Sequence, residues 1–274
     1  MRCAWRWGVL RFFLVTLGIV ALTSFSIDAT DTLRGSQTAL SQLADRWLSV
    51  ECQSGTVPVP YQGAVLCVDV FTVSPGSACP HERPATQEQT TENINTPGCI
   101  PEPVSEAYPW TWVAQHQAES LCARAGKRLL TATEWYQAAL GTPDSDVCNT
   151  HGREARLSGI NQCVSGAGVY DMIGNVWELV AGEVIDRTYH DQLLPESGYI
   201  AGVNATGMPT ESTPRPEHMF NYDYVWTHAS GTRIMMRGGY YGSGSDGGLY
   251  ALHAAIEPTF VGNAIGFRCV YEKP

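Results

Sequence analysis

Residues 126–135 read Gly-Lys-Arg-Leu-Leu-Thr-Ala-Thr-Glu-Trp, and this stretch organises the middle of the chain. Gly126 follows a segment whose small and apolar residues recur on one helical face, and glycine is a typical helix end. Thr131 and Glu134 have the spacing of a capping box, in which each side chain satisfies a backbone N–H of the other residue. The stretch therefore predicts a helix over 111–126, a short connection, and a second helix over 131–141.

Upstream of this stretch, three segments differ in composition and predicted structure. Residues 56–73 are rich in β-branched residues and predict two strands around Tyr61-Gln62-Gly63, with Val65–Val68 the more buried part. Residues 74–109 are rich in Pro, Thr, Glu and Asn without periodicity, which predicts a long loop. Residues 32–50 carry apolar residues at helical spacing, which predicts a short amphipathic helix.

Downstream of residue 141 no long periodic segment occurs. Glycine-rich turns alternate with short apolar runs, which predicts mostly loops and short strands. Residues 186–232 are the most irregular part, and we expect further loop or disorder there.

The beginning of the chain has the pattern of an export signal. Arg2, Arg6 and Arg11 precede an apolar run from Phe12 to Ile27, and no acidic residue occurs before Asp28. A basic start and an apolar core of about 16 residues fit a signal peptide better than a membrane span, which needs about 20 residues. An uncleaved signal that anchors the body outside the membrane is the alternative, and a buried N-terminal helix is a weaker one.

These patterns divide the chain into three parts: 1–29 as signal peptide or signal anchor, 30–55 as a short helical linker, and 56–274 as the main domain. After the apolar run, which ends at Ile27, the chain carries 14 basic and 27 acidic residues, a formal charge of −13. So negative a surface repels phosphate backbones and argues against nucleic acid and anionic membranes as partners. It is compatible with cation binding, although solubility alone would also explain it.

Cysteine usage indicates an oxidising compartment. One of the nine cysteines lies in the leader, and the remaining eight form an even set with no C-x-x-C pair. In an exported chain this predicts four disulfides rather than structural zinc, and sequence alone allows 105 pairings of eight cysteines. The set is Cys52, Cys67, Cys79, Cys99, Cys122, Cys148, Cys163 and Cys269.

Four segments together resemble one known family, the formylglycine-generating enzymes or sulfatase-modifying factors. The segment 126–135 resembles the family signature GKRLPTEAEWE, and Gly168-Val-Tyr-Asp-Met-Ile-Gly-Asn-Val-Trp-Glu178 is similar to GLYDMxGNVWEW. Met236-Arg-Gly-Gly-Tyr240 is similar to RGGSW, and Ala264-Ile-Gly-Phe-Arg-Cys269 to the final GFRC. The resemblance covers roughly residues 60–272 and implies an α+β fold of the C-type-lectin-like kind, rich in loops and stapled by disulfides.

The resemblance also implies disulfide pairs. Family members often join the cysteine before GKRL to the last cysteine, which implies Cys122 with Cys269. Cys148 with Cys163 is then the natural local pair, and Cys79 with Cys99 and Cys52 with Cys67 are left.

Two positions bear on the family's oxidation chemistry. Family enzymes hold copper(I) with two cysteines after the GGS motif, since soft thiolates suit this ion. Aligning Gly238–Gly248 with that segment puts Ser243 and Gly248 in the two cysteine positions. We therefore expect no copper and no formylglycine-generating activity. Other branches use iron bound by an H-x-x-x-H-x-E motif, and the seven histidines here do not form it.

A structural calcium ion is the cofactor that the resemblance implies. The family holds Ca²⁺ in the loop of GNVWE, which here gives the side chains of Asp171 and Glu178 and the carbonyls of Gly174 and Val176. Two carboxylates, two carbonyls and waters satisfy a calcium ion. The alternative is that the loop simply packs and its carboxylates are solvated. A second family site begins at an asparagine like Asn149, but the following segment is much shorter here.

The glycine-rich segment after residue 237 is the predicted ligand surface. Aromatic faces among small polar residues suit peptides or sugars. An ordinary glycine-rich loop is the alternative, and Asn204-Ala-Thr206 is a glycosylation sequon only in a eukaryotic secretory setting. The predicted residues are Tyr240, Tyr241, Ser243, Ser245, Asp246, Tyr250 and His253.

Three functions therefore remain open. The leading hypothesis is an exported, non-catalytic module that binds a protein, peptide or glycan. The rival is an enzyme of the same superfamily with a diverged active site, and the third is an accessory subunit anchored in a membrane through residues 1–27.

Overall fold

The structure is a computed structural model that describes residues 51–272, so the expected leader and the helix expected within 32–50 lie outside the described residues. The hairpin predicted at 56–73 is confirmed as β1 (Thr56–Tyr61) paired antiparallel with β2 (Ala64–Asp69). Its turn places Gln62 and Gly63 at positive φ, 48° and 82°. Glycine tolerates this conformation without strain, which explains the tight turn.

The hairpin belongs to a four-stranded sheet in the order β1-β2-β15-β5. The strand β15 (Cys269–Glu272) lies between β2 and the short β5 (Arg128–Leu129), with Val270 opposite Val68. The sheet therefore joins the beginning, the middle and the end of the described chain.

A larger, nine-stranded sheet is built from the second half of the chain, in the order β10-β9-β11-β13-β12-β6-β7-β8, with β14 paired to β6. The expectation of loop or disorder over 186–232 is wrong, because β7 to β11 lie there. These strands have two to six residues, too few for a clear period in the sequence. The strands are β6 (Trp177–Ile185), β7 (Thr188–Tyr189), β8 (Gln192–Leu193), β9 (Gly198–Val203), β10 (Pro209–Thr213), β11 (Tyr224–Thr227), β12 (Thr232–Arg237), β13 (Leu252–Ala254) and β14 (Ile265–Phe267).

The two predicted helices are confirmed with shorter bounds, as α4 (Gln115–Arg124) and α5 (Ala132–Ala139). Thr131 caps α5: it accepts from the Glu134 amide, and the Glu134 carboxylate accepts from the Thr131 amide. Two short 3₁₀ helices, η1 (His218–Phe220) and η2 (Gly244–Asp246), follow later.

The prediction of a loop over 74–109 is wrong in part. This segment contains β3 (Ser74–Pro75), α3 (Gln87–Asn95) and β4 (Pro101–Glu102). The helix α3 has no apolar stripe and is held by polar contacts instead. The buried Asn93 side chain accepts a hydrogen bond from the His81 amide and donates one to the His81 carbonyl. A helix of this kind leaves no hydrophobic period in the sequence.

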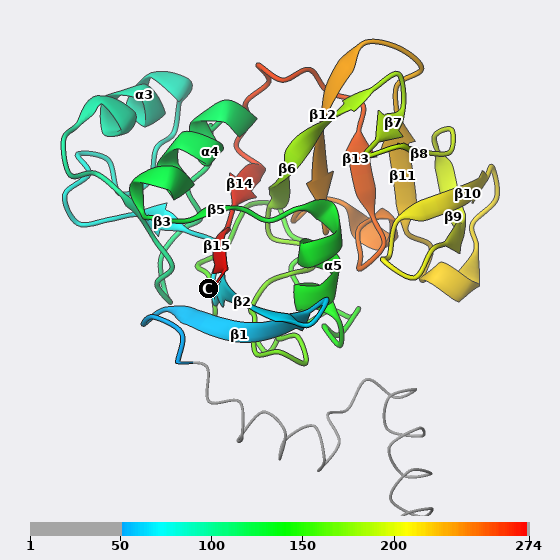
Figure 1. Cartoon of the computed structure of the whole chain (residues 1–274), viewed down its shortest axis with the longest axis horizontal. Coiled ribbons are helices and arrows are strands. Elements are labelled where there is room, and N and C mark those ends of the chain that lie inside the picture. The colour runs from blue at the N-terminus through cyan, green and yellow to red at the C-terminus, as the bar shows by residue number, and fades with distance from the viewer. Residues whose placement is uncertain (1–50, 273–274) are drawn as a thin grey trace, which may run out of the picture. The chain divides into compact units, whose positions relative to one another are not determined.

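The strand β6 separates two hydrophobic cores. Its residues Trp177 and Leu179 face a core that includes α4, whereas Val180 and Val184 face a core that includes α5. Figure 1 shows β6 in the middle of the domain, between α4 and the strands β12 and β13. Residues on alternate sides of one strand thus bury both faces of the sheet.

The described cysteines form four disulfides, and their pairs are those that the family resemblance implies: Cys52–Cys67, Cys79–Cys99, Cys122–Cys269 and Cys148–Cys163. Four disulfides indicate an oxidising, exported compartment. Between residues 51 and 272, no helix is long and apolar enough to cross a membrane.

Candidate binding surface

The charged residues of the 126–135 stretch form ion pairs with other residues of the domain. Lys127 pairs with the fully buried Asp69, whose other oxygen accepts from the Cys269 amide at 2.9 Å. Arg128 donates two hydrogen bonds of 2.7 Å to Glu134, the residue that also caps α5. These contacts join α5, β2, β5 and β15, so this motif stabilises the fold.

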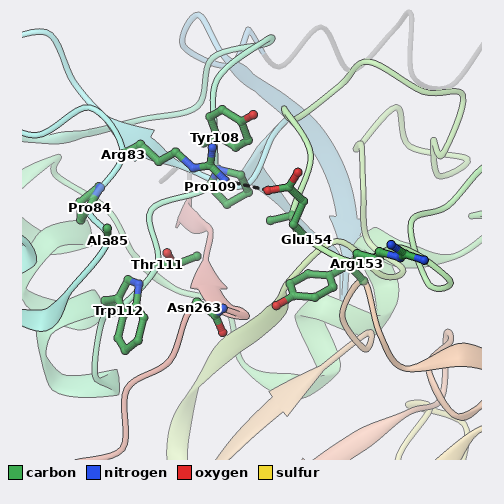
Figure 2. Close-up of a pocket in the computed structure, with 12 residues that line it drawn as sticks. Arg83, Pro84, Ala85, Tyr108, Pro109, Thr111, Trp112, Arg153, Glu154 and Asn263 are labelled. Carbon is green, nitrogen blue, oxygen red and sulfur yellow. Dashed lines mark hydrogen bonds and ion pairs between the residues drawn. The ribbon is translucent and has the colours of Figure 1, made fainter.

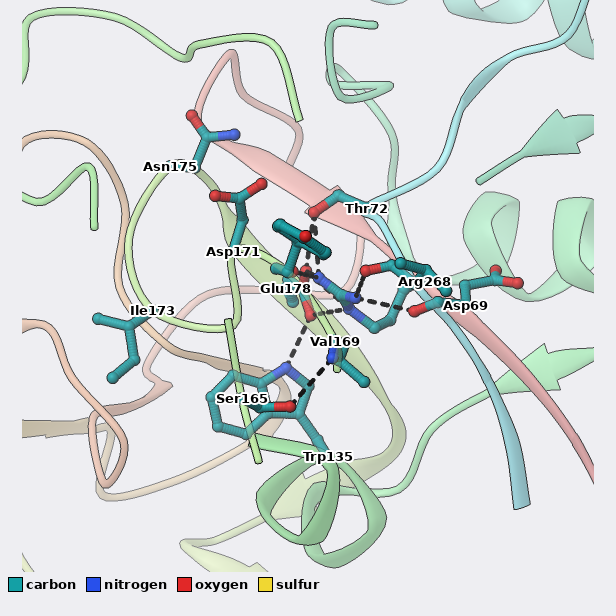
Figure 3. Close-up of polar contacts among 12 residues, drawn as sticks. Asp69, Thr72, Trp135, Ser165, Val169, Asp171, Ile173, Asn175, Glu178 and Arg268 are labelled. Carbon is teal, nitrogen blue, oxygen red and sulfur yellow. Dashed lines mark hydrogen bonds and ion pairs between the residues drawn. The ribbon is translucent and has the colours of Figure 1, made fainter. Parts of the chain in front are cut away.

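Glu178, the last residue of the GNVWE motif, lies in a buried polar network (Figure 3). Arg268 donates from Nε and Nη2 to its carboxylate at 2.6–3.0 Å. Trp135 Nε1 donates at 2.7 Å and the Thr72 hydroxyl at 2.9 Å. The side chains of Glu178 and Arg268 are each 1% exposed. This ion pair joins motifs that are far apart in the sequence.

The network bears directly on the calcium prediction. A carboxylate offers about four lone-pair positions, and four donor groups already occupy those of Glu178. Calcium could bind Glu178 only by displacing at least one of these donors. Glu178 as observed therefore does not fit a calcium ligand, and within residues 51–272 no group of three or more His, Cys, Asp or Glu is placed to hold a metal.

The other predicted calcium residues shape the same loop. Asp171 is buried and adopts a φ of 56°, and its Oδ2 accepts from the Gly159 amide at 2.7 Å. Burial raises the pKa of Asp171 to about 6. Gly174 has a φ of 72°, and a Cβ there would lie 2.5 Å from the Asn149 carbonyl oxygen, while Val176 is buried. Glycine is thus required at 174 by both conformation and space.

The seven predicted ligand residues do not share one surface. Tyr241 lines a pocket with Trp112 and Tyr108, whereas Tyr250 packs against Tyr136 and Phe220, beside the core that includes α5. His253 lies on the opposite face of the sheet.

The remaining predicted residues form a turn. Ser243 Oγ accepts from the Tyr240 amide at 2.9 Å, and the ring of Tyr240 lies 5.1 Å from that of Tyr241. Ser245 is exposed in η2 and Asp246 is half-buried. Burial raises the pKa of the Asp246 carboxyl.

His253 is one member of a continuous series of aromatic rings, which we call the aromatic row: Trp177, His253, Trp226, Tyr224 and Tyr199. Neighbouring rings lie 4.7–5.7 Å apart between centroids, and His253 stacks on Trp226 with 17° between planes. The row crosses β6, β13, β11 and β9. Of these five residues only His253 was predicted from the sequence, although the alternation Tyr224-Val225-Trp226 is a period-two signal.

The aromatic row is the open part of a sheet face that is otherwise covered. The helix α4 packs over the β6 end, where Gln115 donates to the carbonyls of Val180 and Gly182 at 2.7 and 2.8 Å. Tyr199, Tyr224, Trp226 and His253 all remain partly exposed. Burial lowers the pKa of His253 to about 4, so the row is uncharged at neutral pH.

Comparison with known families accounts for this arrangement of motifs. The model of the sulfatase-modifying factor enzyme 1-like domain matches residues 69–273. The chain belongs to this family. The match and the observed mixture of helices and sheets confirm the predicted α+β, C-type-lectin-like fold.

In this sulfatase-modifying-factor-like domain, the two positions expected to carry copper ligands hold no sulfur. Ser243 lies against the backbone of Gly239 and Gly247, and Gly248 lies against the carboxylate of Asp223. All eight cysteines among the described residues are oxidised in disulfides.

Solved structures of similar fold are distant in sequence. The Major Tropism Determinant P3c variant has a TM-score of 0.46 and 16% identity, covering 81% of this chain and 53% of that chain. PvdO from Pseudomonas aeruginosa has a TM-score of 0.44 and 17% identity, covering 80% and 90%. CarF has a TM-score of 0.42 and 16% identity, covering 77% and 87%. The chain spans about half the length of the Major Tropism Determinant. No curated protein matches the sequence.

Proposed function

We propose that this sulfatase-modifying-factor-like domain is an exported, non-catalytic binding module that uses the aromatic row to hold a peptide or glycan. The observation that carries the proposal is the row itself: five rings, each in contact with its neighbour, on a sheet face where four of them are partly exposed. Rigid Tyr and Trp side chains provide large contact areas at low entropic cost. An export signal at 1–29 belongs to the same proposal.

The state of the cysteines supports binding over oxidation. Copper(I) in this family needs two thiolates, whereas Ser243 and Gly248 occupy those positions and the described cysteines are paired. A hydroxyl and a hydrogen atom cannot replace two soft ligands. The fold is thus retained without the sulfur chemistry that it supports elsewhere.

The binding role is tested on the row. A panel of neutral oligosaccharides and of aromatic peptides is screened against the exported protein, and the best binder is titrated by calorimetry. Trp226→Ala should weaken binding about tenfold or more, because a central aromatic anchor typically contributes over 1 kcal/mol. The control is Phe260→Ala, which removes an exposed aromatic ring outside the row. Equal binding by wild type and Trp226→Ala would contradict the proposal.

The enzymatic alternative is tested separately. Purified protein is analysed for metals and incubated with a cysteine-containing sulfatase peptide and copper(I), and the peptide mass is followed. We expect no stoichiometric copper or iron and no conversion of the cysteine to formylglycine. Either a bound redox metal at one equivalent or the aldehyde product would favour the enzyme.

A further inference from the structure

A pocket of about 450 Å³ opens beside the GNVWE loop, outside the aromatic row (Figure 2). This volume lies within the usual range of small-ligand sites. Its walls come from segments that are distant in the chain: residues 83–85, 108–109, 111–112 and 153–155, together with Tyr241 and Asn263. Of its lining residues, only Tyr241 belongs to the ligand surface predicted from the sequence.

The walls of the pocket are firmly held. Trp110 is fully buried, and its backbone amide donates a hydrogen bond to the Val73 carbonyl at 2.8 Å. This contact fixes the segment that carries Tyr108 and Trp112. Trp112 adopts a φ of 59° and donates its amide to the Gly262 carbonyl at 3.0 Å. Positive φ is strained for a bulky residue, and such strain is characteristic of binding sites.

Asn175 holds the opposite wall. Its side-chain oxygen accepts from the Arg156 amide at 2.7 Å, and its side-chain nitrogen donates to the Arg156 carbonyl at 3.2 Å. Its backbone carbonyl accepts from the Tyr241 amide at 3.1 Å. The asparagine of the family motif therefore places both Tyr241 and the 153–155 segment at the pocket.

One arginine of this acidic domain faces the pocket. Arg83, Arg153 and Glu154 are the charged residues of the lining, but the Arg153 guanidinium points away from the hollow in Figure 2, which leaves Arg83 and its partner Glu154 as the charges inside it. The Arg83 guanidinium lies 3.6 Å from the centre of the Tyr108 ring and 3.4 Å from Glu154. The side chains of Arg83 and Glu154 are 51% and 74% exposed. So exposed an ion pair contributes little and is easily exchanged.

We infer that this pocket binds a small carboxylate with an adjoining apolar face, such as a uronic acid or the C-terminal acid of a peptide. The ligand carboxylate takes the place of Glu154 on Arg83, because a planar guanidinium pairs with a carboxylate through two parallel hydrogen bonds. The apolar face lies against the aromatic rings of the lining, which include Trp112 and Tyr241. This site is additional to the aromatic row and goes beyond the proposed function.

The test compares acids with their neutral forms on the exported protein. Glucuronic acid and its methyl ester form one pair of probes, N-acetylphenylalanine and its amide the other, each titrated by tryptophan fluorescence and calorimetry. One acid should bind at least about tenfold more tightly than its neutral form, because a charge-assisted hydrogen bond is worth more than a neutral one. The pair that responds identifies the source as sugar or peptide.

Three variants locate the binding. Arg83→Gln should weaken binding of the acid about tenfold or more. Glu154→Gln should tighten it, since the competing carboxylate is removed. Arg153→Gln is the matched control and should change affinity less than about twofold, because its guanidinium points away from the hollow in Figure 2.

The outcomes separate this inference from the proposed function. Equal binding of acid and neutral probe, an Arg83→Gln protein that binds normally, or no binding of either acid at about 10 mM would overturn the inference. Trp226→Ala should leave binding of the acid unchanged, so failure of the pocket does not decide the role of the aromatic row.

Discussion

Glu178 and Arg268 show how single motif residues act in this domain. They are separated by 90 positions, yet they form a fully buried ion pair in which the carboxylate has a complete set of donors. Desolvation makes such a pair costly to form, but removal of one partner leaves an uncompensated charge. The charged residues of these two motifs therefore stabilise the fold, whereas most candidate binding residues lie outside the motifs.

The variant Glu178→Gln should be strongly destabilised. The amide keeps the shape of the side chain but leaves the Arg268 guanidinium without its counter-charge, and we expect a loss of about 3 kcal/mol in the free energy of unfolding. Urea denaturation measures the loss. Glu196→Gln, which removes an ion pair from a side chain that is 87% exposed, is the control and should change stability by less than about 1 kcal/mol. Similar values for the two variants would contradict the buried-pair argument.

His253 should make stability depend on pH. In the unfolded chain a histidine takes up a proton near pH 6.5, whereas burial lowers the pKa of His253 to about 4 in the folded domain. Its contribution is therefore present above about pH 6.5 and is lost as the pH falls towards 4, by about 1–2 kcal/mol after allowance for partial exposure.

Calorimetric melting between pH 7 and pH 4.5 tests this dependence. His253→Phe keeps an aromatic ring in the row and should flatten the slope. His116→Gln, an exposed substitution on α4, should retain the slope of the wild type. A His253→Phe protein with an unchanged slope would argue against the assignment.

At the scale of elements, turns and helix ends could be predicted from sequence, and strands of the second sheet could not. Thr131 and Glu134 predicted α5 because a capping box is a local signal. The strand β11 has four residues, of which Tyr224 and Trp226 stay half-exposed, so its stability comes from neighbours on both sides. Whether such a short segment forms a strand depends on its pairing with distant segments, and a single sequence does not reveal that pairing.

Gly238 tests how tightly these elements pack. It has a φ of 89°, and a Cβ there would clash with the Met172 carbonyl oxygen and the Trp135 ring. Gly238→Ala should therefore cost more than about 3 kcal/mol. Gly168→Ala is the matched control, with a φ of 83° and open space around it, and should cost only about 1 kcal/mol of backbone strain. Equal losses, measured by urea denaturation, would mean that packing around Gly238 is loose.

At the scale of the whole molecule, the long disulfide should contribute more than the short ones. Cys122–Cys269 closes a loop of 147 residues, and Cys52–Cys67 one of 15. The chain-entropy model gives about 5 kcal/mol for the first and about 3 kcal/mol for the second. Replacing each pair by alanines should lower Tm more for the long loop. A larger loss for the Cys52–Cys67 variant would show that local strain or packing outweighs loop entropy.

Calcium removal is the second test at this scale. A site filled at a hundredfold its Kd would raise Tm by about 5–10 °C. Because Arg268 already neutralises Glu178, we expect a chelator to change Tm by less than about 2 °C. A larger fall on chelation, reversed by added calcium and not by magnesium, would restore the calcium site as the family resemblance implies it.

The fold of the molecule could be predicted because four motifs carry its internal contacts. The binding features could not be predicted, because most of their residues lie outside the motifs, although Trp177 of the row and Asn175 beside the pocket belong to the GNVWE motif. The aromatic row is assembled from four strands, and the pocket takes Arg83, Tyr108 and Glu154 from loops that meet only in three dimensions.

The central position of β15 has a consequence for biosynthesis. A chain synthesised from its N-terminus delivers β15 after β2 and β5, the two neighbours that it must join. Until then the growing chain exposes two unpaired strand edges, which attract other chains. A premature stop before residue 269 would make this exposure permanent. Chaperones that shield strand edges should therefore matter most for this protein before its last strand is released.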